Sequence, residues 1–447
     1  MVTNGSREGE IQRLGRQLAE TFSSPVRHPV KALDDKAIDL ASRDAELRAA
    51  LFRFVDVVPA CRSLEDLARH LSAYLGELDE RPPPLDVAIR MADSKAGARA
   101  LGLAAAAAVR HMAHRFIAGE TPRDALPLLR EMWRDGVAAS VDLLGEATIT
   151  VAEADRYAQR CLAALRTLHD ELAGWPEQPT LERDSVGALA RVNLSVKVSA
   201  LTPLLRPEAP ELGKRDAAVR LRELMRLARA LGAHLHVDME SLDSREAVLE
   251  LVLALLAEDE FAEGPSAGIV VQAYLRDSPQ TLEQVVDWAR RHPRREPLVV
   301  RLVKGAYWDH EIVEARRHGW PAPVFEAKPD SDRNFEALTR RLLDSRPIVR
   351  VAVASHNLRS IAHAIAYNRE LRADDRELEF QVLRGLGDDL QHALASFGLR
   401  VRAYCPVGDL VAGMAYLVRR LLENTSNESF VAAQTHGASV DELLAAP

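Results

Sequence analysis

Apolar and polar residues follow two different patterns along the chain. Residues 1 to about 180 show mainly helical spacing, with apolar residues three or four positions apart, as in Leu64, Leu67 and Leu71. From about residue 190 onward, short β-like runs are separated by helical segments. With one earlier run, the pattern predicts eight strands, at residues 140–145, 192–201, 234–240, 268–274, 298–307, 351–357, 379–385 and 400–407.

The alternation of strands and helices predicts a parallel sheet, and eight such units favour a closed barrel over an open doubly wound sheet. Within the expected strand 192–201, Leu194 and Val196 alternate with Ser195 and Lys197. Helices must cover the outside of a barrel, so we expect the apolar residues to face outward and the polar residues to face the lumen. The expected strand 234–240 alternates in the same way. Taken alone, each of these two runs would also fit a half-exposed antiparallel strand. The fold class expected is α/β, a (β/α)8 TIM-like barrel with an N-terminal helical arm.

The overall composition narrows the classes of function. The chain has 447 residues, of which 28% are charged, and its formal net charge is -8. Charges of both signs are interspersed, which argues against nucleic-acid binding as the main function. The three cysteines, Cys61, Cys161 and Cys405, are far apart and form no C-x-x-C pair, so the sequence signals neither a disulfide framework nor a cysteine zinc site.

Targeting features of the sequence favour a cytoplasmic protein. The charged N-terminus lacks the apolar core of a secretory signal. The longest apolar runs fall well short of the roughly 20 residues that a membrane-spanning helix needs. Contact with a membrane surface stays open, because it requires only a patch.

Candidate chemistry lies at the C-terminal ends of the expected strands, where barrel enzymes carry their active sites. Taken singly, each polar residue there is typical of a solvated rim. Together they form a rich set of cationic and hydrogen-bonding groups: Asp142, Lys197, Asp238, Gln272, the run 301–308, His356, Asn357, the run 383–385 and Tyr404.

A helix is expected to follow the eighth strand, from Asp409 to about residue 425. At roughly 100° per residue, Tyr416, Arg419, Arg420 and Glu423 share one polar sector of it. From the helix alone, a solvent face is favoured, because Arg419 and Glu423 form an i, i+4 pair. The alternative is a clamp for a carboxylate substrate, because guanidinium groups offer planar bidentate donors.

A rival interpretation is a metal-dependent hydrolase. His234 and His236 share one face of an expected strand, as in the H-x-H metal pairs of barrel hydrolases. Such a site needs further strand-end ligands, and only His356 offers itself. The histidines fit better as hydrogen-bonded groups of the lower lumen, so no metal is expected. The sequence also lacks a dinucleotide-binding glycine fingerprint.

Four segments carry a resemblance to a known family: VNLSVKVSAL, RLVKGAYWD, ASHN and AYLVRRLLEN. They resemble the proline dehydrogenase family, most closely the dehydrogenase domain of proline utilization A, in collinear order from about residue 140 to 430. The resemblance implies a distorted β/α barrel that binds FAD noncovalently and oxidises L-proline to Δ1-pyrroline-5-carboxylate. It divides the chain into a helical arm at 1–95, an FAD-binding barrel at 96–435 and a tail at 436–447.

The resemblance also implies roles for individual residues. Asp238 and Arg301 match polar groups close to substrate and flavin and are the catalytic candidates, although a structural role for Asp238 is an open alternative. The substrate-binding candidates are Lys197, Tyr307, Leu383, Tyr404, Arg419, Arg420, Glu423 and Glu146, the last as a residue that closes the site. The FAD-binding candidates are Gln272, Arg301, Val303, Lys304, Gly305, Ala306, Trp308, Lys328, His356 and Asn357.

Partners and alternatives follow from the same resemblance. The expected partners are L-proline, a quinone acceptor reached at a membrane surface, and a pyrroline-5-carboxylate or glutamate-semialdehyde dehydrogenase of the same pathway. No nucleic acid is expected. The final segment SVDELLAAP resembles the stretch that leads into an aldehyde dehydrogenase in bifunctional relatives, so a monofunctional enzyme and a fragment of a longer one both stay open. A barrel that holds flavin without turnover is a further alternative.

Overall fold

A computed structural model describes residues 4–22, 45–79, 86–87, 89–90, 92, 94–145, 148–409, 413, 416 and 438–447. Eight parallel strands close into a barrel in sequence order, with β8 paired to β1. The strands are β1 (Val137–Leu143), β2 (Asn193–Val196), β3 (His234–Val237), β4 (Ser266–Gln272), β5 (Leu298–Val303), β6 (Val349–Ala354), β7 (Leu378–Leu383) and β8 (Arg400–Val407). The predicted (β/α)8 barrel is confirmed.

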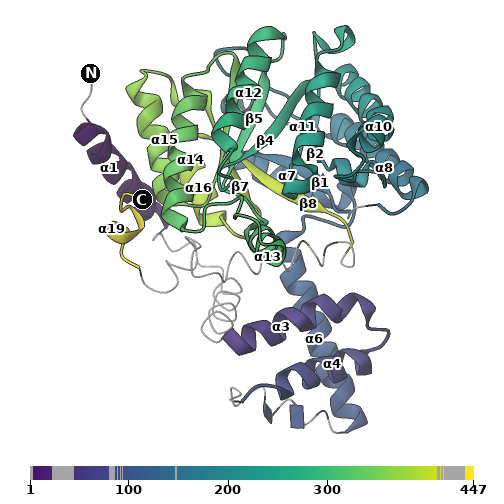
Figure 1. The fold of residues 1–447 in the computed structure, drawn as a ribbon. Helices are drawn as coiled ribbons and strands as arrows, with labels where there is room; N and C mark the ends of the chain where they lie inside the picture. Colours follow the sequence, from purple (N-terminus) through teal and green to yellow (C-terminus); the bar gives the residue numbers. More distant parts are fainter. Residues whose placement is uncertain are drawn as a thin grey trace.

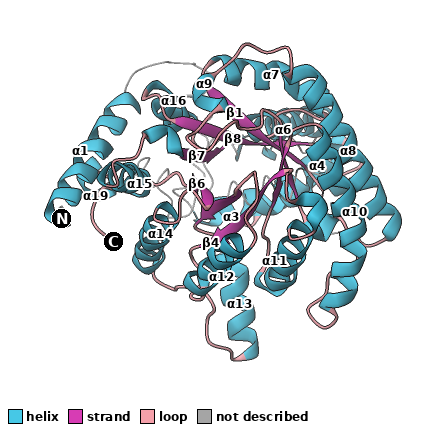
Figure 2. Ribbon diagram, turned by 90° about the horizontal axis from the view of Figure 1, so that it is seen from above, coloured by secondary structure: helices cyan, strands magenta, loops and turns pink. Residues whose placement is uncertain are grey.

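Helices surround the barrel on its outside, as Figure 2 shows from above. The described α-helices are α1 (Asn4–Phe22), α3 (Ala45–Val57), α4 (Leu64–Gly76), α6 (Lys95–Phe116), α7 (Pro122–Arg134), α8 (Val151–Leu172), α9 (Pro179–Glu182), α10 (Pro210–Ala230), α11 (Leu242–Leu256), α12 (Ser278–Arg291), α13 (Trp308–His318), α14 (Lys328–Leu343), α15 (Leu358–Glu370), α16 (Asp388–Ser396) and α19 (Val440–Leu443). Short 3-10 helices occupy Val58–Ala60, Val198–Ala200, Asp259–Phe261 and Asp375–Glu377.

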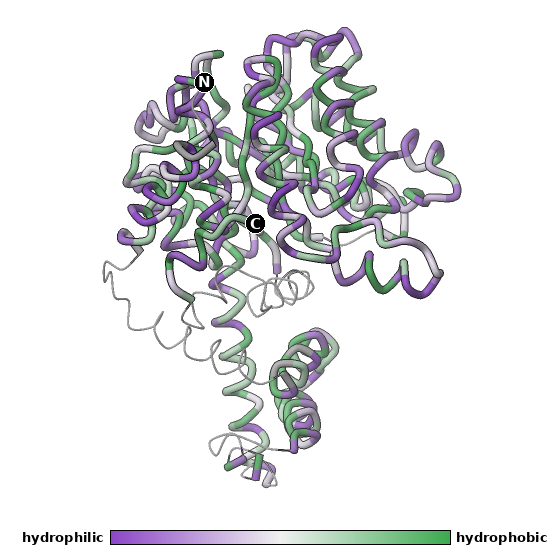
Figure 3. Tube along the Cα trace, turned by 60° about the vertical axis from the view of Figure 1, so that its left-hand side comes forward, coloured by the Kyte–Doolittle hydropathy of each residue, from purple (hydrophilic) through white to green (hydrophobic). Residues whose placement is uncertain are grey.

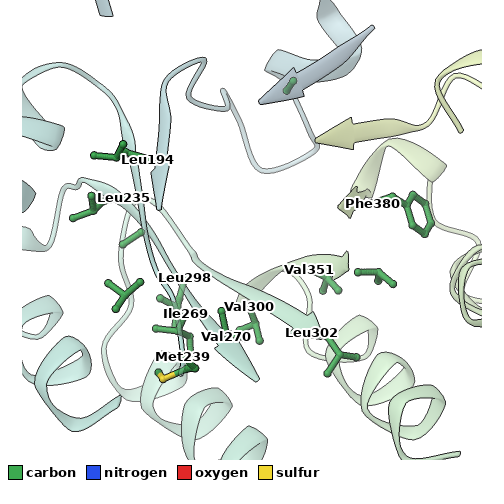
Figure 4. Packing of buried hydrophobic residues seen from close by; sticks show 14 of the residues in the cluster. Leu194, Leu235, Met239, Ile269, Val270, Leu298, Val300, Leu302, Val351 and Phe380 are labelled. Atoms are coloured by element: carbon green, nitrogen blue, oxygen red, sulfur yellow. The ribbon is translucent and has the colours of Figure 1, made fainter. Parts of the chain in front are cut away.

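The alternation within the strands separates two environments. Leu194, Leu235 and Ile269 are buried in the apolar layer that includes the surrounding helices, and Figure 4 shows them on neighbouring strands. The polar residues between them cross the lumen instead, because Arg301 on β5 donates a hydrogen bond to Ser195 on β2 at 3.3 Å. Burying polar groups requires partners. The lumen is therefore a hydrogen-bonded polar core.

Three helices form an arm on the side of the barrel mouth (Figure 1). Helices α3, α4 and α6 share a core that includes Phe54, Leu71 and Val109, and the hydropathy colouring of Figure 3 shows apolar stretches in the arm as well as in the barrel. The end of α6 meets the barrel mouth, where Arg115 Nε donates to the carbonyl of Gly385 at 3.0 Å. The arm is thus attached beside the C-terminal ends of β7 and β8.

Helix α1 lies apart from this arm. It packs on α15 and α16 at the outside of the barrel, next to α19 (Figure 1). The division of the chain at residue 95 stays a prediction. Within the described part of the chain, no helix has the length and apolar character that crossing a bilayer would require.

Candidate active site

A cavity of about 340 Å³ opens at the C-terminal ends of the strands. It brings together most of the residues that the sequence singled out, which come from strands β2 to β8 and the loops that follow them. The predicted residues that line it are Lys197, Asp238, Gln272, Arg301, Val303, Lys304, Gly305, Ala306, Tyr307, Lys328, His356, Asn357, Leu383 and Tyr404.

Trp308 does not line the cavity. It begins α13 and its indole Nε1 donates to the carbonyl of Phe325 at 2.9 Å, while its ring packs beside Tyr274 and Ile312. Its predicted contact with a cofactor stays a prediction.

Four predicted residues, Arg419, Arg420, Glu423 and Glu146, lie outside the described residues. Tyr416, which shares the predicted polar sector with Arg419, Arg420 and Glu423, is described. It is 8% exposed and lines the cavity.

Asp238, at the end of β3, is the centre of the hydrogen-bond network. Its carboxylate accepts from Arg301 Nη1 at 2.6 Å, from the Tyr404 hydroxyl at 2.7 Å and from Ser195 Oγ at 3.1 Å. Burial alone would raise the pKa of Asp238, but the Arg301 and Lys197 cations outweigh burial and lower it. Asp238 is therefore an ionised carboxylate with every near neighbour donating to it.

Lys197, just after β2, bridges two carboxylates. Its Nζ lies 2.7 Å from Asp142 Oδ1 and 3.6 Å from Asp238 Oδ2. Burial would lower the pKa of Lys197, yet Asp142 and Asp238 raise it above the usual value. Burial, followed by the same two carboxylates, also holds the pKa of Tyr404 well above its usual value. At neutral pH the network therefore presents an ammonium and a protonated phenol.

Arg301 projects from β5 and is 5% exposed. Its Nε donates to Gln381 Oε1 at 2.6 Å, and its two terminal nitrogens donate to Asp238 and Ser195. A guanidinium has five N–H groups, so these bonds to described residues use three of them. One N–H on each terminal nitrogen has no partner among the described residues, and Arg301 lines the cavity.

Two further lysines, Lys304 and Lys328, also line the cavity. Lys304, after β5, and Lys328, at the start of α14, both pair with Asp332. Burial lowers the pKa of Lys304 to about 8, although Asp332 opposes the shift. The pair of lysines also stands at the N-terminus of α14, where the helix dipole favours anions.

Gly305 gives the cavity a backbone wall. Its φ of 138° lies in the region that favours glycine, and a Cβ there would come within 2.3 Å of the Tyr274 ring. Nearby, Gln272 Nε2 donates to the carbonyl of Glu240 at 3.1 Å, while its buried Oε1 has no partner among the described residues. Position 305 therefore requires glycine because the Tyr274 ring lies against its backbone, and the Gln272 Oε1 is left as a hydrogen-bond acceptor.

The histidines take two different positions. His356 Nε2 accepts the backbone N–H of Leu383 at 2.9 Å, which fixes the end of β7 at the cavity. His234 and His236 lie lower in the lumen, where the His234 ring contacts Ser266 Oγ at 2.8 Å and His236 Nδ1 at 3.1 Å. Burial and then Arg402 lower the pKa of His234 to about 3. In the described part of the chain, no three His, Cys, Asp or Glu side chains gather as metal ligands would.

Sequence reasoning missed Gln381, which lines the cavity, and Asp332, which pairs with two of its lysines. Gln381 lies two positions before Leu383 on the same strand face, and that spacing could have found it. Asp332 looked like an ordinary i, i+4 partner of Lys328 on a helix surface, and nothing in the sequence shows that Lys304 shares it.

Two protein-family models match the chain. The family model described as Proline dehydrogenase matches residues 125–433. A second model, Proline utilization A N-terminal domain, matches residues 8–116.

Individual relatives agree with these matches. The chain is 34% identical over 352 residues to "Bifunctional protein PutA" of Escherichia coli, covering 76% of this chain and 25% of that protein. It is 27% identical over 323 residues to "Proline dehydrogenase 1" of Bacillus subtilis subsp. natto, covering 71% of this chain and 89% of that protein. The chain thus spans about a quarter of the length of the bifunctional relatives it matches.

A solved structure covers nearly the whole chain. Proline utilization A from Bdellovibrio bacteriovorus, inactivated by N-propargylglycine, matches with a TM-score of 0.88 and 36% identity. The match covers 98% of this chain and 44% of that one.

Proposed function

The chain belongs to the proline dehydrogenase family, and we propose that it oxidises L-proline to Δ1-pyrroline-5-carboxylate with noncovalently bound FAD. One observation carries the proposal. A single cavity is lined by the Asp238–Arg301–Tyr404–Lys197 network and by the Lys304–Lys328 pair. A zwitterionic substrate and an anionic dinucleotide cofactor need such a division of charge.

The residues of the cavity fit FAD. Lys304, Lys328 and the N-terminus of α14 would hold its diphosphate, because cations and helix N-termini both favour phosphate oxygens. Gly305 adds bare backbone to the cavity wall, and the unpartnered Oε1 of Gln272 would offer the bound ring a hydrogen-bond acceptor. Bound FAD would supply the two-electron acceptor, and Arg301 would stabilise negative charge on it.

Substrate binding is proposed to involve both network and helix. Lys197, Arg419 and Arg420 would bind the proline carboxylate, with Glu423 orienting the arginines and Glu146 closing the site. The position of Tyr416 in the cavity supports this assignment, because the helix expected from the sequence, at about 100° per residue, would put residues 419, 420 and 423 in the same sector as Tyr416. Tyr404 and Leu383 would pack on the pyrrolidine ring and Tyr307 would lie near it.

Oxidation removes a hydride from the ring carbon next to nitrogen and a proton from the amine, which leaves the C=N bond of the product. The protein must chiefly fix distance and orientation for this step. Asp238 is proposed to position Arg301 and Tyr404 rather than accept the amine proton, because its carboxylate already accepts three hydrogen bonds and its lowered pKa makes it a weak base.

The remaining partners are proposed from the family alone. We propose a quinone as the electron acceptor, reached at a membrane surface, and a pyrroline-5-carboxylate dehydrogenase as the pathway partner. The name "Bifunctional protein PutA" indicates that those relatives carry a second activity, which supports a second enzyme as partner without naming its reaction.

The function is tested with purified protein, L-proline and an artificial electron acceptor. Arg420→Met is expected to raise the Michaelis constant for proline roughly 10- to 100-fold while flavin stays bound, because a hydrogen bond to a charged group contributes about 1.5–3 kcal/mol. Arg290→Met, at a surface pair with Asp287, is the matched control. If flavin-loaded protein does not reduce the artificial acceptor when L-proline is added, the proposed function is rejected. If Arg420→Met leaves the Michaelis constant for proline unchanged, the carboxylate clamp is rejected.

A further inference from the structure

Gln381 stands between the active-site cavity and the lower lumen. It projects from β7, is 5% exposed, and lines both the 340 Å³ cavity and a polar cavity of about 30 Å³ beneath it. Gln381 can therefore connect the charged groups of the active-site cavity with the charged groups of the lower lumen.

The amide of Gln381 is fixed in one orientation. Its Oε1 accepts from Arg301 Nε at 2.6 Å, and its Nε2 donates to Glu379 Oε1 at 2.7 Å. A guanidinium can only donate and an ionised carboxylate can only accept. Turning the amide over would therefore break both hydrogen bonds.

Glu379 is itself held as an anion. Its two oxygens accept from Arg402 Nε and Nη2 at 2.9 and 3.1 Å, and Arg402 also donates to the carbonyl of Ala139 at 3.0 Å. Burial would raise the pKa of Glu379, but Arg402 outweighs burial and lowers the pKa to about 2. The carboxylate therefore stays ionised at any pH at which an enzyme is assayed.

We propose that Gln381, anchored by the Glu379–Arg402 pair, is a positioning residue that aims the two remaining N–H groups of Arg301 at a bound flavin. This inference rests on the proposed function and deepens it. Asp238 and Ser195 bind the terminal nitrogens of Arg301 from the side of β3 and β2. Gln381 alone among the described residues bonds Nε, so it fixes the rotation of the guanidinium plane.

Loss of the Gln381 hydrogen bond should affect the stability of the reduced flavin more than the binding of proline. Negative charge develops on the flavin ring during reduction, and a correctly aimed guanidinium stabilises it. A variant in which the Arg301 guanidinium is no longer held in this orientation should have both a lower flavin reduction potential and a lower kcat. The Michaelis constant for proline should change little, because Gln381 contacts Arg301 and Glu379 and neither is assigned to the carboxylate.

The experiment compares Gln381→Met and Glu379→Gln with Gln391→Met, a buried glutamine on α16 that does not line the cavity. Purified full-length variants are measured for flavin content, thermal midpoint, flavin midpoint potential by dye equilibration, and steady-state kinetics with L-proline. Gln381→Met should bind flavin at a lower midpoint potential, with kcat reduced roughly 10-fold or more and the Michaelis constant within about twofold.

Glu379→Gln should shift the potential in the same direction, because its new amide no longer dictates the orientation of Gln381. Gln391→Met should keep the wild-type potential. A Gln381→Met protein that loses thermal stability but keeps the wild-type potential and kcat would overturn the positioning role and leave the proposed function standing. Wild-type protein that holds no flavin, or flavin that L-proline never reduces, would instead reject the proposed function itself.

Discussion

At the scale of single residues, each buried charge of the lumen is matched to an opposite one. Lys197 pairs with Asp142, Arg301 with Asp238, and Arg402 with Glu379. Removing one member would leave a buried charge without its partner, which typically costs about 3–5 kcal/mol. The polar lumen is therefore as constrained as the apolar layer around it, and its charges are held in place before any ligand binds.

Lys304 should make flavin binding sensitive to pH. Its pKa of about 8 means that it is protonated below that pH and loses its charge above it. A bound diphosphate favours the protonated lysine, so the dissociation constant for FAD should begin to rise as the pH passes about 8. Fluorescence titration of flavin-stripped protein from pH 6.5 to 9.5 measures the effect.

Lys304→Met should bind FAD more weakly at pH 7 and show a flatter pH dependence across the same range. Lys214→Met provides the control, because Lys214 pairs with Glu211 and Glu250 at the surface. If wild type and Lys304→Met show parallel pH profiles, Lys304 does not contact the phosphates.

The sequence could reveal those site residues that stand at strand ends in recognisable motifs, such as Lys197 and Arg301. It could not reveal Gln381 as their partner, because the bond to Arg301 joins β7 to β5 across the lumen. The sequence also could not reveal the role of Asp332, because Lys304, its second lysine partner, lies on a different loop. Contacts across a closed barrel depend on register, which composition and spacing do not specify.

At the scale of elements, short β-like runs between helical segments predicted all eight strands, but several predicted strands ended too late. The predicted strand 192–201 ends at Val196, and the predicted strand 298–307 ends at Val303. Residues beyond these points leave the sheet and carry Lys197 and the run 304–307 into the cavity. The alternation of residue types continues past the last ladder hydrogen bond, so the pattern alone cannot locate that end.

Gly268 on β4 tests how tightly the strands fit inside the lumen. A Cβ at this position would lie 2.2 Å from His236 Nδ1 and 3.1 Å from His234 Nε2. The two rings hold each other by a hydrogen bond and His234 also contacts Ser266, so they have little freedom to move. Gly268→Ala should lower the free energy of unfolding by about 1–3 kcal/mol, as overpacking typically does.

Urea unfolding followed by circular dichroism measures this change. Gly174→Ala is the matched control, because no atom lies within 4 Å of its added Cβ. Equal stability of the two variants would show that the histidine pair yields readily, contrary to the packing described.

At the scale of the whole molecule, two segments far apart in sequence fasten onto the same side of the barrel. Arg359 of α15 donates to Glu8 of α1 at 2.7 Å, to Glu336 of α14 at 2.8 Å and to the carbonyl of Leu444 at 2.8 Å. The Leu444 side chain is fully buried against Gly15. Helical spacing in residues 1–22 predicted a helix but could not show that it packs on the barrel, away from the arm.

Leu444→Ala should loosen α1 from the barrel. The lost packing and the cavity left behind typically cost about 2–5 kcal/mol at a buried leucine, so trypsin should cut faster at the exposed Arg13 and Arg16 of α1. The half-exposed Leu212 of α10 provides a control through Leu212→Ala. Mass spectrometry of timed digests gives the rates, and identical rates in wild type and Leu444→Ala would show that Leu444 does not hold α1.

The proposed function requires that this barrel use a bound flavin to oxidise L-proline. The most direct measurement adds L-proline to the purified protein under anaerobic conditions and follows the visible flavin spectrum. We predict a yellow protein whose flavin absorbance bleaches on addition of L-proline and returns when an electron acceptor is added. A colourless protein that takes up no flavin, or a yellow one whose spectrum L-proline leaves unchanged, would show that the barrel does not catalyse this oxidation.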